Sequence, residues 1–193
     1  MALFSRLMRY MSAQQRKQED RPAERLYQSV LLASRQPDLY TEFDLQDHLD
    51  SRFDMLCLHI SLLMSRLRML PEDVHKPLNQ ELFDRFFADM DFTLREMGVG
   101  DLGVGKRVRK MSEAFMGRLT AYSDALEINQ RPALAMALAR NVRRAEGCTD
   151  TDKHMDDYVM ACRDRLAVVC DEKLQIGTVD LVSVLALGGN HHG

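Results

Sequence analysis

The chain has 193 residues, of which 46% are hydrophobic, and its formal net charge at pH 7 is -3. This length and apolar content suit one well-cored domain, and the weak net charge argues against a general nucleic-acid-binding protein, so we expect no specific nucleic-acid partner. The 13 methionines, against no tryptophan, indicate a core or an exposed apolar surface that can repack.

The cysteine pattern does not suit a metal site. No two cysteines form a C-x-x-C pair, and free thiols fit better than a zinc site for Cys57, Cys148, Cys162 and Cys170. The longest apolar run, 133–139, falls well short of the roughly 20 residues that span a bilayer. We therefore expect no metal, no cofactor, and a soluble or peripheral protein.

Residues 1–18 predict a basic amphipathic helix, which we separate from a single helical domain over 19–193. Apolar side chains share one stripe, and only basic charges precede Glu19. The pattern is typical of a membrane-surface helix or a transit-peptide-like leader, and equally of a first core helix with a solvated basic face. The membrane-surface interpretation depends on Leu3, Phe4, Arg6, Leu7 and Arg9.

Proline and apolar spacing mark the next helices. Pro22 favours the start of a helix that ends before Pro37, and 38–47 predicts an irregular or single-turn crossing. Over 49–70, apolar residues alternate spacings of four and three. This heptad seam favours packing inside a helical bundle over homodimerisation through the seam. His59 flanks the seam without a second ligand at helical spacing, which predicts a hydrogen-bonded structural histidine.

Pro71 ends this helix, and Pro77 favours the start of the next one. One apolar helical face then covers 82–97 and a second covers 108–126. Between them, residues 98–105 predict a glycine-rich elbow. Its glycines are expected to supply positive φ at a helix end and to let two backbones approach closely. They are Gly98, Gly100, Gly103 and Gly105.

The charge order around the elbow is unfavourable for isolated helices. Glu96 and Asp101 are expected at or just past the end of the first helix, and basic residues in the first turns of the second. Acids are favoured near helix N-termini and bases near C-termini, by roughly 0.3 to 1 kcal/mol each when exposed. Either Asp89, Asp91 and these two acids neutralise the cations, or an acidic or polar surface of another protein docks there. The cations are Lys106, Arg107, Arg109 and Lys110.

Two nucleotide-binding motifs within the elbow are rejected. The G-x-G-x-x-G match over 98–103 needs a preceding strand, where the pattern predicts a helix. The G-x-x-x-x-G-K match over 100–106 has Arg107 where the magnesium-binding Ser or Thr belongs. A small-ligand-binding enzyme at the elbow is the alternative function, but no nucleophile–base pair or metal set can be assembled from the sequence.

The remaining chain continues the helical pattern. Residues 134–142 predict a short Ala-rich helix, Thr151 is the candidate N-cap of a helix over 155–169, and a last short helix or strand-like segment follows Gly177. The acids and histidine within 150–157 match neither a calcium loop nor a zinc triad and indicate a solvated acidic face. We predict an all-α, single-domain bundle of about six to seven helices.

Several sequence blocks together resemble one family. The most specific is Leu-Arg-Glu-Met-Gly-Val-Gly-Asp over 94–101, and the others are 35–37 with Tyr40, 51–53 with 58–59, 89–91, 104–108, and 117–119 with Tyr122. These blocks resemble the ubiquinol-cytochrome c chaperone family, the assembly factors for the cytochrome b subunit of the bc1 complex. The resemblance covers roughly 22–126.

The resemblance implies a helical chaperone without catalysis. It would bind newly made cytochrome b or another bc1 complex component, and mitochondrial members work with a small partner protein. A short chain suits a bacterial member, in the cytoplasm with peripheral contact at the inner face of the membrane; a eukaryotic member would lie on the matrix side. The residues expected to face a partner or fix the elbow are Arg95, Glu96, Asp101, Lys106, Arg107 and Arg118.

Overall fold

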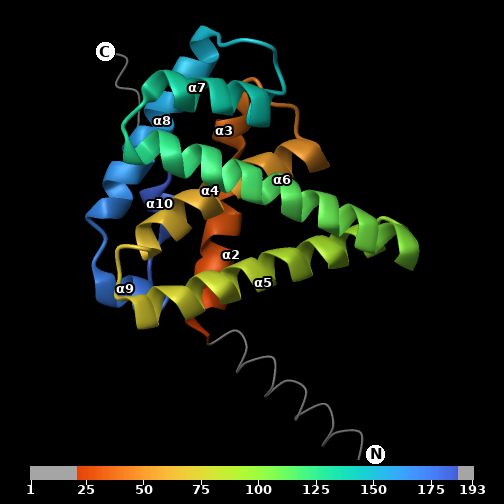
Figure 1. Ribbon diagram of the computed structural model, residues 1–193, viewed down its shortest axis with the longest axis horizontal. Coiled ribbons are helices and arrows are strands. Elements are labelled where there is room, and N and C mark those ends of the chain that lie inside the picture. The colour runs from red at the N-terminus through yellow and green to blue at the C-terminus, as the bar shows by residue number, and fades with distance from the viewer. Residues whose placement is uncertain (1–20, 187–193) are drawn as a thin grey trace, which may run out of the picture.

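The computed structural model describes residues 21–186, and every regular element in this range is helical (Figure 1). The all-α prediction is confirmed, with six helices of seven residues or longer and three shorter ones in the described range. In chain order the elements are α2 (Pro22–Ser34), α3 (Pro37–Glu42), α4 (Leu49–Leu67), α5 (Glu72–Glu96), α6 (Asp101–Glu127), α7 (Arg131–Leu138), the π-helix η1 (Ala139–Arg143), α8 (Asp150–Ala167), α9 (Asp171–Gln175) and α10 (Leu181–Val184).

Helix α4 is the centre of the core. It packs against α2, α5, α6 and α8 (Figure 1), and the seam residues Leu56, Ile60 and Leu63 are buried. A seam covered by helices of the same chain is not available for a second copy. The prediction of packing within a bundle is therefore confirmed, and homodimerisation through the seam is wrong.

His59 is a structural residue, as predicted. Its ring is fully buried, with Nδ1 2.7 Å from the Met55 carbonyl oxygen and Nε2 2.7 Å from the Tyr158 hydroxyl. The Tyr158 hydroxyl donates to the Leu185 carbonyl oxygen at 2.7 Å. These hydrogen bonds join α4 and α8 to the segment that follows α10, so His59 contributes to packing between distant parts of the chain.

The start of α5 differs from the prediction. The helix begins at Glu72, directly after Pro71, and Pro77 lies inside it. Proline lacks the N–H that would bond to the carbonyl four residues earlier, which costs one hydrogen bond close to the helix end. The acids Glu72 and Asp73 in the first turn favour this earlier start through the helix dipole.

Helix α8 is capped by Thr149 and not by Thr151. The Asp152 carboxylate accepts a hydrogen bond from the Thr149 amide at 2.6 Å, which completes a capping box. Asp152 and Asp156 are buried, and each forms an ion pair, with Arg143 and Arg131 respectively. The prediction of a wholly solvated acidic face is therefore wrong, because these two carboxylates lie inside the bundle. Among residues 21–186 no cluster of three metal-ligating side chains is found.

The predicted terminal segment is a short helix, α10, packed against α2. Ser29 of α2 donates to the Val179 carbonyl oxygen at 3.2 Å and accepts from the Leu181 amide at 2.9 Å. Gly177 has φ of 68°, and a Cβ there would lie 2.5 Å from the Pro22 carbonyl oxygen. The chain thus closes on its own first described helix. The predicted helix over 1–18, with its five membrane-surface residues, lies outside the described residues.

Candidate functional site

The α5–α6 hairpin projects beyond the rest of the bundle and ends in the segment singled out from the sequence (Figure 1). At its base, aromatic rings of both helices pack together, with the Phe86 and Phe115 centroids 5.2 Å apart. The Arg85 Nε donates to the Glu24 Oε2 at 2.8 Å, and the Tyr27 hydroxyl donates to the Asp89 Oδ2 at 2.7 Å. These contacts hold α5 against α2 and so fix the direction in which the hairpin points.

The connection at the hairpin tip is short. Gly98 has φ of 79°; its amide donates to the Arg95 carbonyl oxygen at 2.9 Å and the Val99 amide donates to the Leu94 carbonyl oxygen at 3.1 Å. This pair of hydrogen bonds is a Schellman motif, which explains why glycine stands at position 98. The prediction of positive φ at the helix end is confirmed for Gly98.

The predicted elbow over 98–105 is too long, because α6 already begins at Asp101. Gly100 is the N-cap residue, and Gly103 and Gly105 lie in the helix. The predicted close approach of two backbones is also wrong. A Cβ at Gly98, Gly100 or Gly105 would meet nothing within 4 Å, and one at Gly103 would meet only the Val99 side chain, at 3.0 Å. A helix tolerates glycine in its first turns at modest cost.

Arg95 bridges the two helices of the tip. Its Nε donates to the Asp91 Oδ2 at 2.6 Å, and its Nη1 donates to the Asp101 carboxylate. The hydrogen bond to Asp91 makes the largest contribution, and the hydrogen bond to Asp101 the next largest, to a pKa of Arg95 that is raised above its usual range. Arg95 therefore links the last turn of α5 to the first residue of α6, on the exposed side of the turn.

The predicted charge conflict at the tip is only partly present. Asp101 is in the first turn of α6, where an acid is favoured, whereas Glu96 ends α5, where an acid is disfavoured. The helix-dipole effect falls off beyond the first turn, and the basic residues begin at Lys106, so their interaction with the dipole is weak. The basic residues of α6 therefore cost less than the roughly 0.3 to 1 kcal/mol each that applies within the first turn.

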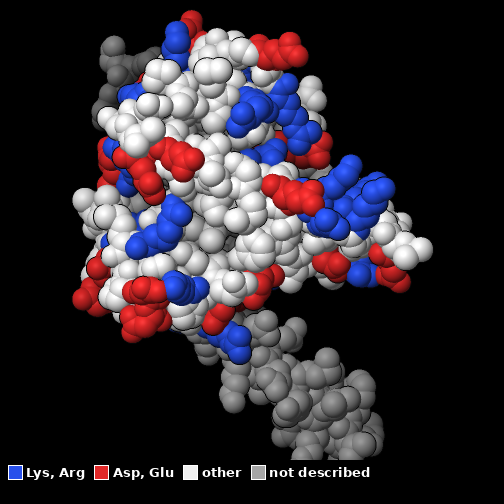
Figure 2. All heavy atoms as spheres, viewed as in Figure 1, with Lys and Arg blue, Asp and Glu red and all other residues white. Residues whose placement is uncertain are grey.

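Exposed cations nevertheless gather on the outer side of α6 near the tip (Figure 2). Arg109 pairs with Glu113 at 3.1 Å, but within 21–186 no ion pair engages Lys106, Arg107 or Lys110. Three of the four nearby acids are already used, since Asp91 and Asp101 bind Arg95 and Asp89 binds Arg85 and Tyr27, and the fourth, Glu96, forms no ion pair within 21–186. Internal neutralisation of these three cations, one of our two interpretations, is therefore wrong.

Exposed apolar side chains also lie at and near the apex of the hairpin; Phe92 and Leu102 were not singled out from the sequence, and Met97 was wrongly placed on the apolar face of the first helix. Leu102 is 98% exposed, Met97 is 57% exposed and Phe92 is 61% exposed. Leu102 lies outside the stripe that contains the buried Val104 and Phe115, so its position on the helix could have shown that it points away from the core. The tip thus combines an apolar apex with a cationic side.

Arg118 does not belong to this site. It lies in the middle of α6, where its Nη2 donates to the Asp54 Oδ1 at 2.7 Å and its guanidinium covers the Phe53 ring. Arg144, in a left-handed conformation after η1, binds the other oxygen of Asp54 at 3.0 Å. The prediction that Arg118 faces a partner is wrong, because its guanidinium is bound to the buried Asp54 carboxylate. Burial raises the pKa of Asp54 to about 6, and the guanidiniums of Arg118 and Arg144 oppose that shift.

The arrangement of the tip does not suit a nucleotide site. Helix α5 precedes the turn where both nucleotide motifs need a strand. No helix within the described range has the length and apolar content to cross a membrane. The tip is a protruding surface of apolar side chains and of cations without an ion-pair partner among residues 21–186, a combination that fits recognition of another surface.

Comparisons with known proteins agree on one family. The family model described as Ubiquinol-cytochrome C chaperone matches residues 41–180. The crystal structure of the Cbp3 homolog from Brucella abortus is similar, with 35% sequence identity and a TM-score of 0.77 over 93% of this chain and 99% of that chain. No curated protein sequence matches.

Proposed function

The chain belongs to the ubiquinol-cytochrome c chaperone family, and from this premise we propose that it assists assembly of the bc1 complex by binding newly made cytochrome b. The hairpin tip is the proposed binding surface. The observation that carries this assignment is the exposed cation cluster, in which Lys106, Arg107 and Lys110 have no ion-pair partner among residues 21–186. Unpaired surface cations attract a complementary partner at little desolvation cost.

The apolar apex supports a client that is a membrane protein. Leu102 and Met97 are exposed beside the cations, and methionine adapts its shape to different apolar surfaces. A polytopic client offers apolar segments flanked by polar loops before it is assembled. In this proposal the apex contacts an apolar segment, and the cations contact an acidic or polar loop next to it.

Two of the predicted partner-facing residues hold the turn in this proposal, and a third, Glu96, still faces a partner. Arg95 and Asp101 hold the turn in shape through their ion pair and so position the apex. Glu96 has no ion pair in the described range and remains exposed at the end of α5. It is the one acid of the tip left free to select a partial positive charge on the client or on a small partner protein.

We assign no catalysis to the chain and propose that it acts on the cytoplasmic or matrix side, where the client is made. Residues 1–18 would add reversible contact with an anionic membrane through their apolar stripe and basic residues. Co-sedimentation of the full chain and of a chain lacking residues 1–18 with anionic vesicles tests this contact. Equal sedimentation of the two would contradict it.

The test of the client site is charge reversal. The double variant Lys106→Glu/Arg107→Glu should co-purify about tenfold less cytochrome b from cells that respire through a bc1 complex, with an unchanged helical circular dichroism spectrum and Tm. The matched control is Arg140→Glu/Lys173→Glu, which has the same charge change at exposed positions away from the tip. It should capture cytochrome b normally.

The possible results separate the site from the function. Full capture by the folded tip variant would refute the tip as the client surface while leaving the chaperone function intact. A wild-type chain that captures no cytochrome b, together with normal bc1 levels in cells lacking the protein, would refute the function itself.

A further inference from the structure

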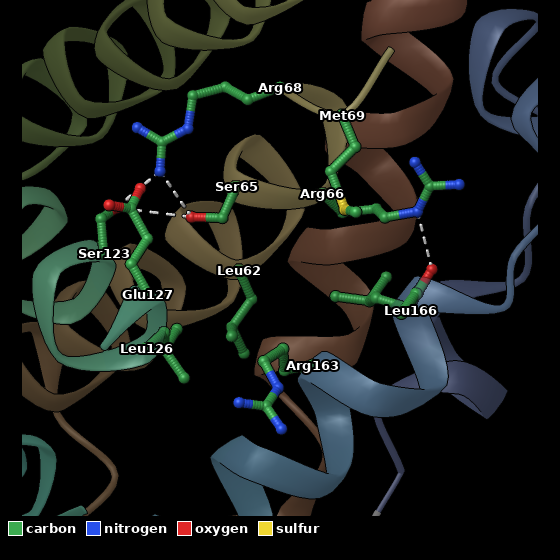
Figure 3. A pocket seen from close by; sticks show the side chains of 11 residues that line it. Leu62, Ser65, Arg66, Arg68, Met69, Ser123, Leu126, Glu127, Arg163 and Leu166 are labelled. Carbon is green, nitrogen blue, oxygen red and sulfur yellow. Dashed lines mark hydrogen bonds between the residues drawn. The ribbon is translucent and has the colours of Figure 1, made fainter. Parts of the chain in front are cut away.

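A recess lies at the opposite end of α6 from the hairpin tip, where α4, α6 and α8 all end (Figure 3). Its volume is about 470 Å³, which is within the range of small-molecule sites in proteins. Leu102 at the tip and Ser123 at the recess are separated by about 30 Å along the helix axis. The recess is therefore a separate site, and what it binds goes beyond the proposed chaperone function.

The floor of the recess is apolar. Side chains from the three helices surround it, and they include Leu62, Leu126 and Leu166 (Figure 3). Ala167 also lines the recess. Met69 flanks the opening with 73% of its surface exposed. An apolar floor of this size, flanked by a flexible thioether, favours a chain of methylene groups over a polar or rigid ligand.

One oriented guanidinium lies at the mouth of the recess. The Arg68 Nη2 donates to the Ser65 Oγ at 3.0 Å and to the Ser123 Oγ at 2.8 Å, so two hydroxyls hold it in place (Figure 3). Within 21–186 no carboxylate lies within 4.0 Å of Arg68 and its Nε and Nη1 have no protein acceptor. Arg68 is therefore oriented and has free N–H donors for an anion.

The other charged residues of the lining differ from Arg68. Arg66 donates through Nε to the Leu166 carbonyl oxygen and through Nη2 to the Val169 carbonyl oxygen, and its charge is paired with Asp171. Arg163 pairs with its neighbour Asp164 at 2.7 Å. Glu127 also lines the mouth and pairs with no cation of the described chain, and its negative charge would weaken the attraction of an anion. Arg68 is thus the principal anion-binding group.

We propose that the recess binds a single acyl chain whose anionic head, a carboxylate or a phosphate, is held by Arg68. The acyl chain would cover the apolar floor while the head stays at the solvent-exposed mouth. A peptide is a poorer occupant, because its backbone N–H and C=O groups need partners, and the recess offers two serine hydroxyls already bound to Arg68. The ligand class is therefore a fatty acid or a single-chain phospholipid.

Isothermal titration calorimetry of the full chain with dodecanoate, below its micellar concentration, tests the proposal. One binding site is expected. Decanoate, which is shorter by two methylenes, should bind roughly 15-fold more weakly, since each buried methylene changes affinity about fourfold. Dodecyl maltoside has the same chain length and no charge, and it should bind at least about tenfold more weakly than dodecanoate.

Variants locate the site. Arg68→Met should weaken dodecanoate binding about tenfold, while Arg68→Lys keeps the charge and should retain most of the affinity. Ala167→Phe adds a ring at an exposed lining position and should abolish binding by filling the recess. Glu127→Gln removes the opposing charge and should tighten binding. The matched control Arg140→Met removes an exposed arginine elsewhere and should change nothing.

Comparison of dodecanoate with lysophosphatidic acid of equal chain length shows which head group the site prefers. Tighter binding of dodecanoate would indicate a carboxylate, and tighter binding of lysophosphatidic acid a phosphate. Circular dichroism checks that each variant folds. Failure of both ligands to bind would overturn the proposal. It would also be overturned if folded Arg68→Met and Ala167→Phe both bound as the wild type does, or if dodecyl maltoside bound as tightly as dodecanoate.

Discussion

The Asp54 carboxylate on α4 and the Arg118 guanidinium on α6 lie 2.7 Å apart, and the Asp54 side chain has no exposed surface. Arg144 binds the second oxygen of the same carboxylate from the end of η1. One buried charge therefore connects three elements that are far apart in the sequence. The pair fixes how α6 lies on α4, and α6 in turn carries the hairpin tip at one end and the recess at the other.

Removal of Arg118 should destabilise the protein strongly. Arg118→Met leaves Asp54 buried with only Arg144 as its partner, which should cost about 3 kcal/mol of unfolding free energy. The double variant Asp54→Leu/Arg118→Met should be more stable than Arg118→Met alone, because no uncompensated charge remains buried. Urea denaturation monitored by circular dichroism measures both. A double variant less stable than each single variant would contradict this account of the pair.

The exposed arginine of the tip should behave differently. Arg95→Met removes two ion pairs whose members are largely in contact with solvent, and such pairs contribute little to stability. We expect a urea midpoint close to that of the wild type. The same variant should reduce cytochrome b capture, because the turn between α5 and α6 loses its bridge. A large loss of stability would show that the tip is part of the cooperative core.

Burial of His59 should make stability depend on pH. Burial lowers the pKa of His59 to about 4, against an ordinary value near 6.5. The unfolded chain therefore takes up a proton between these values that the folded chain refuses, and stability present above pH 6.5 is lost as the pH falls towards 4. Between pH 7.5 and 5 this loss should be about 2 kcal/mol.

Asp54 acts in the opposite direction over nearly the same range. Its pKa is raised to about 6 in the folded protein, so the folded chain takes up a proton below pH 6 that the unfolded chain takes up only near pH 4. This contribution to stability grows as the pH falls. The wild type should therefore show little net pH dependence, whereas His59→Gln should become more stable relative to the wild type at pH 5. An NMR titration in which His59 protonates near pH 6.5 would refute the prediction.

The sequence was sufficient for features that depend on local spacing. The heptad spacing over 49–70 identified α4, and the apolar stripes of α5 and α6 with Gly98 between them identified the hairpin. The predicted turn was longer than the observed one, because glycine is compatible with both a loop and the first turn of a helix. The start of α5 was wrongly placed at Pro77. Proline is compatible both with the first residue of a helix and with a position shortly after it, where it costs only one hydrogen bond.

Features that depend on distant contacts could not be predicted in the same way. Arg118 was assigned to the tip because it lies in one of the blocks that resemble the chaperone family, but its partner Asp54 is 64 positions away. The recess combines Arg68, Ser123 and Leu166 from three helices, and no spacing in the sequence brings them together. Long-range packing therefore decides which cations are buried and which remain available for binding.

Among the glycines of residues 21–186, Gly177 should be the least tolerant of substitution. Its φ of 68° disfavours any residue with a Cβ, and that Cβ would lie 2.5 Å from the Pro22 carbonyl oxygen and 2.8 Å from the Pro22 Cα. Backbone atoms cannot move aside as a flexible side chain can, so α2 or the segment before α10 must shift. Gly177→Ala should therefore destabilise the protein by at least about 2 kcal/mol.

The matched control is Gly117→Ala in the exposed middle of α6, where an added Cβ meets nothing within 4 Å. Alanine has the higher helix propensity, so this variant should gain about 0.5 to 1 kcal/mol. Thermal and urea denaturation of the two variants give the comparison directly. Both variants replace glycine by alanine, so changes of opposite sign in the unfolding free energy would identify the backbone geometry at Gly177 as the cause. A Gly177→Ala protein as stable as the wild type would show that the contact between the α9–α10 connection and α2 is not a tight one.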